Sequence, residues 1–351
     1  MTGLTALWTA VYGLALVCFP DAGAQAAAQG LALCGRVLLP ALFPWLVLAH
    51  LLVGLGAGER LGKALSPVMG PMFHAPGAGA AALALGALGG YPTGAAVVRS
   101  LLDQETIDVR EAEGLLCFCC NAGPAFALSV AGAAVFGDLR SGAALLAVHL
   151  LSALLTGLLL RPAQTPRSVN RSPKGKDIPA AALLTTALGR ALESSLHICA
   201  CVVFFQVLTG LLETALPLGR LPVSLHALVT GALELSGGVC ALTGQRTVTA
   251  LAVAAFLLGW GGCSVHCQVA ALMAGSGVSL APYLRGKLLQ GLLSAALVLG
   301  LGRTLSPLLA AGAGGGMAGL FPVSVPLGWV IWAVTALTLL RRDRPCNCPG
   351  T

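Results

Sequence analysis

The residues most able to bind a small molecule form four polar, glycine-rich interruptions of long apolar runs. In the first half of the chain they are Gly89-Gly90-Tyr91-Pro92-Thr93-Gly94 and Asn121-Ala122-Gly123-Pro124. In the second half they are Glu234-Leu235-Ser236-Gly237-Gly238 and Gly261-Gly262-Cys263-Ser264-Val265-His266-Cys267-Gln268. Glycine and proline both disfavour a continuous helix. We therefore expect a helix break at each of these places.

A helix break can bind an anion without any ionised residue. The half-helix that starts at the break exposes backbone N–H groups and the one that ends there exposes C=O groups, so the two ends carry opposite partial charges. We expect Gly90, Thr93 and Gly94 to line one such opening, because glycine allows close backbone approach and threonine adds a hydroxyl. The simpler alternative is that these glycines and prolines only shape tightly packed helices.

Polar side chains at the other interruptions extend this candidate site. The amide of Asn121 could donate to a carboxylate or accept from an amine. Ser264, His266 and Gln268 alternate with Val265 and Cys267, so a locally extended segment would place all three polar side chains on one side. The remaining candidate substrate-binding residues belong to the same breaks: Gly89, Tyr91, Pro92, Gly123, Glu234, Ser236, Gly237, Gly238, Gly261 and Gly262.

Two catalytic or metal-binding interpretations of the fourth interruption are weaker. Cys263, His266 and Cys267 would supply three zinc ligands, but no fourth ligand lies nearby in the sequence. Ser264 and His266 would make a nucleophile and a base, but no carboxylate lies close enough in the sequence to orient the histidine. We therefore expect no metal, no cofactor and no enzymatic activity.

Three acids stand in the apolar part of the second half, at Glu193, Glu213 and Glu234. An ionisable residue inside a membrane is costly and usually functional. Glu234 adjoins a break and could carry a coupling proton or another cation, such as sodium. Glu193 lies near an expected span start, whereas Glu213 shortly precedes Pro217, as at a span end.

The composition is typical of a polytopic membrane protein. Of the 351 residues, 57% are hydrophobic and 9% are charged, whereas a soluble domain has roughly 25% charged residues. The uncharged runs allow roughly seven to ten membrane-crossing or re-entrant segments, since a span needs about 20 apolar residues. The net charge of +7 lies mainly in short loops and aromatic residues are only 5%, which argues against a nucleic-acid partner. The first apolar segment could be a retained span or a cleaved signal.

Two related halves are expected, joined by a basic linker. Each half has an uncharged run too long for one span, at 64–98 and at 247–284. Interrupted apolar runs in corresponding places of two halves indicate a transporter site at the membrane midplane. The expected parts are an N-terminal span and connector at 1–35, a first half at 36–160, the basic linker at 161–177, a second half at 178–302, and a glycine-rich loop, last span and basic tail at 303–351.

Four motifs carry a resemblance to a known family: LPALFPWLVLAHLLVGLG (39–56), GALGGYPTGAAVVRSL (86–101), EAEGLLCFCCNAGPAFALSVAGAAVFGD (111–138) and WGGCSVHCQVAALMAGSGVSLAPYLRGKLLQGLLSA (260–295). They resemble the sporulation integral membrane protein family of YlbJ type, in the nucleoside-recognition or Gate domain group. The similarity covers 36–302. The chain departs from the family pattern at Gly89, where serine is frequent, and at Cys120, where asparagine is frequent.

The resemblance implies a membrane protein of spore-forming bacteria, linked to passage of dipicolinate across the outer forespore membrane. It also implies an all-α fold similar to concentrative nucleoside transporters, with re-entrant hairpins and broken transmembrane helices in two related halves. We expect a multi-pass transporter of the cell membrane that moves a small organic anion by alternating access. The alternatives are a nucleoside or other small-metabolite carrier and a non-transporting membrane scaffold of spore assembly. Self-association as a homo-oligomer is left open.

The basic segments predict the topology. Arginine and lysine are densest in the 161–177 linker and the 341–351 tail. Because cytoplasmic loops carry an excess of these residues, both segments should face the cytoplasm. Reporter fusions at each segment would measure this, and readings on opposite sides of the membrane would contradict the arrangement in two halves.

Overall fold

Every regular element in the described part of the chain is a helix. The computed structural model describes residues 2–55, 57–162 and 180–311, and there is no β-strand within these ranges. The expected all-α class is therefore confirmed. Most of the expected linker at 161–177 and most of the expected final part at 303–351 lie outside the described residues.

The elements before the linker include two π-helices, which are marked η1 and η2. The helices on the two sides of Phe19 are bent by 102°, because Pro20 disfavours helical geometry at the residue before it. In order, the elements are α1 (Thr2–Cys18), α2 (Pro20–Leu33), η1 (Cys34–Leu38), α3 (Leu39–Gly54), α4 (Ala57–Phe73), α5 (Gly79–Gly89), α6 (Tyr91–Asp103), α7 (Val109–Cys119), η2 (Ala125–Phe136) and α8 (Leu139–Leu159).

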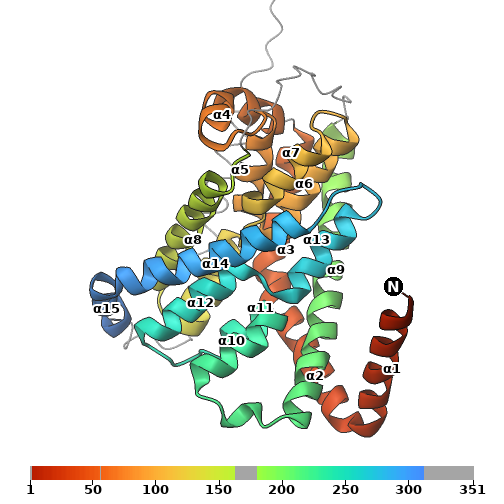
Figure 1. The fold of residues 1–351 in the computed structure, drawn as a ribbon, viewed down its shortest axis with the longest axis vertical. Coiled ribbons are helices and arrows are strands. Elements are labelled where there is room, and N and C mark those ends of the chain that lie inside the picture. The colour runs from red at the N-terminus through yellow and green to blue at the C-terminus, as the bar shows by residue number, and fades with distance from the viewer. Residues whose placement is uncertain (1, 56, 163–179, 312–351) are drawn as a thin grey trace, which may run out of the picture. The chain divides into compact units, whose positions relative to one another are not determined.

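The elements after the linker begin with the longest helix. It packs beside α2 and α3 (Figure 1), and a Cβ added to Gly30 would lie 3.1 Å from the Val203 Cα, so glycine permits the close approach to α2. In order, the elements are α9 (Ala180–Ala215), the 3₁₀ turn η3 (Leu218–Arg220), α10 (Val223–Leu233), α11 (Leu235–Cys240), α12 (Val248–Trp260), α13 (Gly262–Met273), α14 (Ala281–Gly300) and α15 (Gly302–Ala311).

Several of these helices are long and apolar enough to cross a membrane. Among the described residues they are Leu139–Leu159 and Ala182–Ala215, together with Val248–Met273 if α12 and α13 are taken as one broken span, and the bent pair at the N-terminus would make a fourth span. The sequence allowed roughly seven to ten segments because it counted re-entrant pieces as well as spans. In the structure the breaks divide the other apolar runs into short helices such as Gly79–Gly89, Ala125–Phe136 and Val223–Leu233.

Helices break at all four expected places. Gly90 separates α5 from α6 with φ +92°, and Gly261 and Gly262 separate α12 from α13 with φ +90° and +79°. Only glycine adopts this left-handed region readily. The chain is extended at Cys120, which ends α7, and at Glu234, which lies between α10 and α11.

Small residues bring the helices after the linker close together. α12 and α14 lie side by side (Figure 1), and a Cβ added to Gly259 would lie 2.4 Å from the Cα of Gly291. α14 also packs on α8, where the hydroxyl oxygens of Ser152 and Ser294 are 2.6 Å apart. Membrane helices generally associate through such small and weakly polar contacts. These contacts pack α14 closely against α12 and α8.

The close Gly259–Gly291 contact predicts that a larger residue at position 259 lowers the stability of the protein. Gly259→Ala should lower the stability by roughly 1–3 kcal/mol, because the added methyl meets backbone and not a movable side chain. Gly189→Ala is the matched control, since a Cβ at this helical glycine of α9 meets nothing within 4 Å. Thermal unfolding in detergent would compare the two. Equal melting temperatures would show that α12 and α14 do not pack through these glycines.

Candidate functional site

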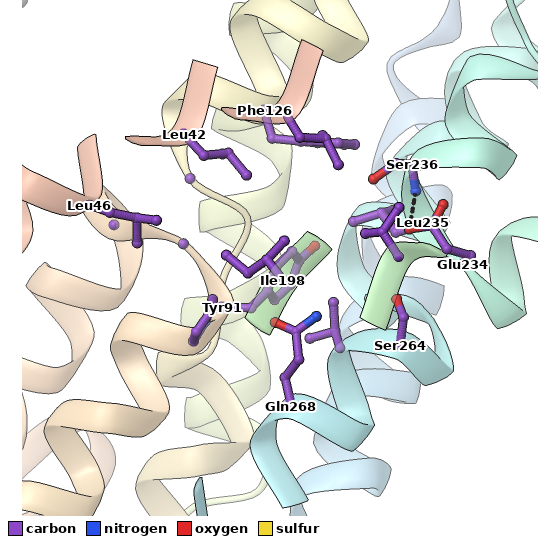
Figure 2. Close-up of a pocket in the computed structure, with 17 residues that line it drawn as sticks. Leu42, Leu46, Tyr91, Phe126, Ile198, Glu234, Leu235, Ser236, Ser264 and Gln268 are labelled. Carbon is purple, nitrogen blue, oxygen red and sulfur yellow. Dashed lines mark hydrogen bonds between the residues drawn. The ribbon is translucent and has the colours of Figure 1, made fainter. Parts of the chain in front are cut away.

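A cavity lies where the four helix breaks meet (Figure 2). About 60 Å³ of its space is open to the centre of a water molecule, which is enough for several waters. Each break contributes to its wall: Gly89, Gly90, Tyr91 and Pro92 from the first, Gly123 and Phe126 from the second, Glu234, Leu235 and Ser236 from the third, and Ser264, Val265 and Gln268 from the fourth.

The remaining wall of the cavity is apolar and comes from helices that do not break at the site. Figure 2 shows Leu42 and Leu46 of α3 on one side and Ile198 of α9 between them and the polar wall. Leu38 of η1 and Val202 of α9 complete this surface. A planar or apolar part of a ligand would lie against these aliphatic side chains, while its polar groups would face the breaks.

The polar wall contains two side chains that lack a protein partner. Ser264 and Gln268 are one turn apart on α13 and are 1% and 4% exposed. Neither side chain makes a hydrogen bond to another residue within the described structure, and both line the cavity. In Figure 2 the Gln268 side chain extends from α13 towards the cavity. Since buried polar groups are nearly always hydrogen-bonded, a ligand or water is the natural partner of both.

The expected extended segment at 264–268 is wrong, because α13 begins at Gly262 and the segment is helical. Residues four apart share a helix face and residues two apart do not, so Ser264 and Gln268 lie together while His266 points elsewhere. The Nδ1 of His266 is 3.0 Å from the Tyr283 hydroxyl, and its ring packs edge-on against Trp260. The structure therefore places His266 outside the cavity wall.

Glu234 caps the short helix α11. Its side-chain oxygens accept hydrogen bonds from the backbone N–H groups of Ser236, at 3.0 Å, and Gly237, at 2.6 Å. The carboxylate thus occupies the start of α11, so the N–H groups of Ser236 and Gly237 are not free to bind an incoming anion. Of the other two acids, Glu193 is exposed and lies well inside α9, whereas Glu213 lies near the end of α9, as expected.

Gly237 and Gly238 line a second cavity. A Cβ added to Gly238 would lie 2.1 Å from the Gly231 Cα, so this glycine also allows α11 to pack on α10. Glu213 and His226 form a hydrogen-bonded pair in this second cavity, with 2.7 Å between the carboxylate and Nε2. The other polar residues that line it are Gln29, Gln206, Thr209 and Thr230.

Thr93 and Gly94 do not line the cavity around the breaks. A Cβ added to Gly94 would lie 2.2 Å from the Cys119 carbonyl oxygen, so Gly94 lets α6 pack on α7. The side chain of Thr93 is buried against Gly89, whose added Cβ would lie 2.5 Å from the Thr93 hydroxyl oxygen. For Gly94 the packing interpretation that the sequence left open is the better one.

Gly261 and Gly262 do not line the cavity. They let the backbone of the fourth break lie close to other elements of the site. A Cβ added to Gly261 would lie 3.5 Å from the Tyr91 ring, and one added to Gly262 would lie 3.0 Å from the Leu235 N. The fourth break therefore contacts the first and the third directly.

Asn121 lies behind the cavity in a polar cluster that the sequence analysis missed. Its Nδ2 donates to the Phe118 carbonyl at 2.7 Å, and its Oδ1 accepts from Gln290 Nε2 at 2.9 Å. Both ends of the amide are thus used within the protein. Asn121 is fully buried and does not reach the cavity.

Lys287 of α14 is the ionised member of this cluster. Its Nζ donates to the Cys120 carbonyl at 2.5 Å and to Gln290 Oε1 at 2.6 Å, and the Ala122 N–H donates to His149 Nε2 at 2.9 Å. Lysine and glutamine one turn apart in a largely apolar segment are visible in the sequence. They are not predicted as site residues when charged residues are used only to mark the ends of apolar runs.

The comparison with known proteins found a similar sporulation membrane protein. No family model and no solved structure matches the chain. The protein named "Sporulation integral membrane protein YlbJ" from Bacillus subtilis (strain 168) is 28% identical over 327 residues, which cover 81% of this chain and 78% of that protein. This similarity supports the resemblance to the YlbJ-type family. The chain is a multi-pass integral membrane protein, as its apolar helices also indicate.

The Glu234 cap predicts how the protein responds to substitution at this position. Glu234→Gln should lower the stability by about 1–2 kcal/mol, because an amide has one acceptor atom for the two N–H groups of Ser236 and Gly237. Glu234→Asp keeps a carboxylate at a position where aspartate caps well, so it should cost less. Thermal unfolding in detergent measures both. A glutamine variant as stable as the wild type would mean that Glu234 does not cap α11.

Proposed function

We propose that this protein is a membrane transporter of a small organic anion, with dipicolinate as the candidate substrate during sporulation. The observation that carries the proposal is the cavity at the meeting point of four helix breaks, with the unpartnered Ser264 and Gln268 in its wall. Non-helical backbone inside a membrane is tolerated where it lines a cavity or is buried in protein. Transporters commonly build their substrate sites in this way.

The unpartnered side chains favour a ligand over a purely structural role. Leaving a buried amide without a hydrogen bond costs about 1–3 kcal/mol, and a ligand that pairs with it recovers that free energy. The side chains of Ser264 and Gln268 have no hydrogen-bond partner within the described residues, and both line the same cavity. A scaffold protein has no need of polar groups directed into an internal cavity, so this observation counts against the scaffold alternative.

The helix starts around the cavity favour a negatively charged ligand. α6 begins after Gly90 and α13 begins after Gly261, and neither start is capped by a side chain. The first turn of α13 therefore retains backbone N–H groups that no side chain caps, whereas in α6 Pro92 has no N–H and Thr93 donates to the Gly90 carbonyl, which leaves the Tyr91 N–H. The helix dipoles place partial positive charge at both starts. Dipicolinate, a planar dianion, has carboxylates that suit two such starts and a ring that suits the aliphatic wall.

The remaining parts of the proposal rest on the family resemblance. The Bacillus subtilis relative is named as a sporulation integral membrane protein, and we extend a role in sporulation to this chain. We also propose two related halves of Gate-domain type, with transport by alternating access coupled to a proton or sodium ion. A nucleoside carrier is the second candidate, since the Gln268 amide has both a donor and an acceptor and could pair with the edge of a base.

Substitutions on α13 test the site. Gln268→Leu and Ser264→Ala should each reduce uptake of labelled dipicolinate into proteoliposomes by about 10- to 100-fold, the loss expected for a hydrogen bond to a charged group. Cys267→Ser is the matched control, because Cys267 is exposed on the same helix and does not line the cavity.

Competition with unlabelled nucleosides separates the candidate substrates. Transport of nucleosides in place of dipicolinate would favour the second candidate. A folded wild-type protein that transports neither would contradict a transport function and support the scaffold alternative.

A further inference from the structure

Lys287 is a fully buried ammonium in the middle of α14. Its side chain is 0% exposed, and its hydrogen bonds go to the Cys120 carbonyl and the Gln290 amide oxygen, which are neutral acceptors. Neutral acceptors stabilise the charge locally but leave it uncancelled. A buried charge without a counter-ion is strongly unfavourable.

A carboxylate partner for Lys287 is absent from the described side chains. The ion pairs there are Arg99–Asp103 and His226–Glu213. The ionisable groups that interact with Lys287 are the thiols of Cys117, Cys119 and Cys120 and the imidazoles of His149 and His266, none of which is a carboxylate. The Cys117 thiol itself donates to the carbonyls of Glu113 and Pro282, so it carries its proton.

The ammonium lies directly behind the wall of the cavity. Nζ is 5.6 Å from the centroid of the Tyr91 ring, within the range of a cation–π contact, and Tyr91 lines the cavity. The Tyr91 hydroxyl donates to the Leu258 carbonyl at 2.5 Å, which fixes the ring between the charge and the cavity. Gly123, three residues after the carbonyl that binds Lys287, lines the same cavity.

We propose that Lys287 is the fixed positive charge that makes the cavity select anions over neutral ligands of the same shape. This inference rests on the proposed function. It follows from the placement of an uncancelled charge one aromatic ring away from a ligand site. In a medium of low dielectric constant a charge acts across such a distance without contact. The substrate's carboxylate is then the missing counter-charge.

The position of Glu234 strengthens this inference. Glu234 lines the same cavity, and its carboxylate is bound by two backbone N–H groups of α11. Without Lys287, the only formal charge beside the cavity among the described residues would be negative, and an anionic ligand would be repelled. Lys287 therefore decides which sign of charge the cavity accepts.

A purely structural role makes a different prediction. In that case Lys287 would serve only to tie the end of α7 to α14 through the Cys120 carbonyl. Any change that keeps this tie would then leave ligand preference unchanged. Gln290→Glu is such a change, because it retains the lysine and places a carboxylate within about the existing 2.6 Å of Nζ. It cancels the charge and keeps the bond from Lys287 to the Cys120 carbonyl, although it loses the hydrogen bond that Gln290 Nε2 donates to Asn121.

The experiment compares binding of dipicolinate with binding of its neutral diamide to the full chain in proteoliposomes. Lys287→Gln and Gln290→Glu should each weaken dipicolinate binding by about tenfold and leave diamide binding unchanged. A tenfold change corresponds to one charge acting across about 10 Å at an effective dielectric constant near 20. Lys287→Arg should retain the preference for dipicolinate. Arg285→Gln is the matched control, since Arg285 is exposed on the same helix.

The outcomes separate the inference from the proposed function. Gln290→Glu that folds and keeps the wild-type preference for dipicolinate would overturn the role of Lys287, with transport intact. Equal weakening of dipicolinate and diamide in both variants would also overturn it, since this would indicate lost structure and not lost charge. A wild-type protein that binds neither compound would contradict the proposed function itself. Gln290→Glu keeps the test decisive if Lys287→Gln does not fold.

Discussion

The structure depends on one constraint, which is that the backbone groups freed by a helix break inside a membrane must find new partners. Each unsatisfied group in hydrocarbon costs several kcal/mol. At three of the breaks the partner of a freed carbonyl is a side chain from a distant element. Lys287 donates to the Cys120 carbonyl at the second break. Trp260 donates to the Ala232 carbonyl before the third break, at 3.1 Å. The breaks therefore depend on side chains that distant elements supply.

Tyr91 extends the same pattern to the fourth break. It follows the first break directly and donates to the Leu258 carbonyl at the end of α12. Trp260, the last residue of α12, in turn donates to the third break. The first, fourth and third breaks are thus linked in sequence by two aromatic side chains. A set of breaks that supply each other's hydrogen bonds has to lie around a common point, and the space left between them is the cavity.

The sequence could predict where the helices break, because glycine and proline act locally. Gly90 and Gly261 adopt positive φ because glycine has no Cβ, which is a property of the residue itself. It could not predict which side chains face the cavity, since that depends on the packing of elements far apart in the chain. Gly94 looked equivalent to Gly90, yet the nearby Cys119 carbonyl makes it a packing residue.

The error at Ser264, His266 and Gln268 has a similar origin. Alternating polar residues indicate a strand-like face only where the backbone is extended, and the same three residues on a helix split into a pair and an outlier. Gly261 and Gly262 both have positive φ and change the chain direction within two residues. α13 therefore begins at Gly262 and places Ser264 and Gln268 on one helix face. Lys287 was overlooked for a different reason. A hydropathy count treats a lysine as the end of a span, whereas packing against α7 buries it completely.

The two ionised residues beside the cavity are each hydrogen-bonded by neutral groups and not by each other. Glu234 is held by N–H groups at the start of α11, and Lys287 is held by a carbonyl at the end of α7 together with an amide oxygen. A direct salt bridge would have cancelled both fields and left a neutral site. Because the two charges stay apart, each remains available to a ligand between the breaks. Helix ends thus allow a membrane protein to keep opposite charges near one cavity without collapsing it.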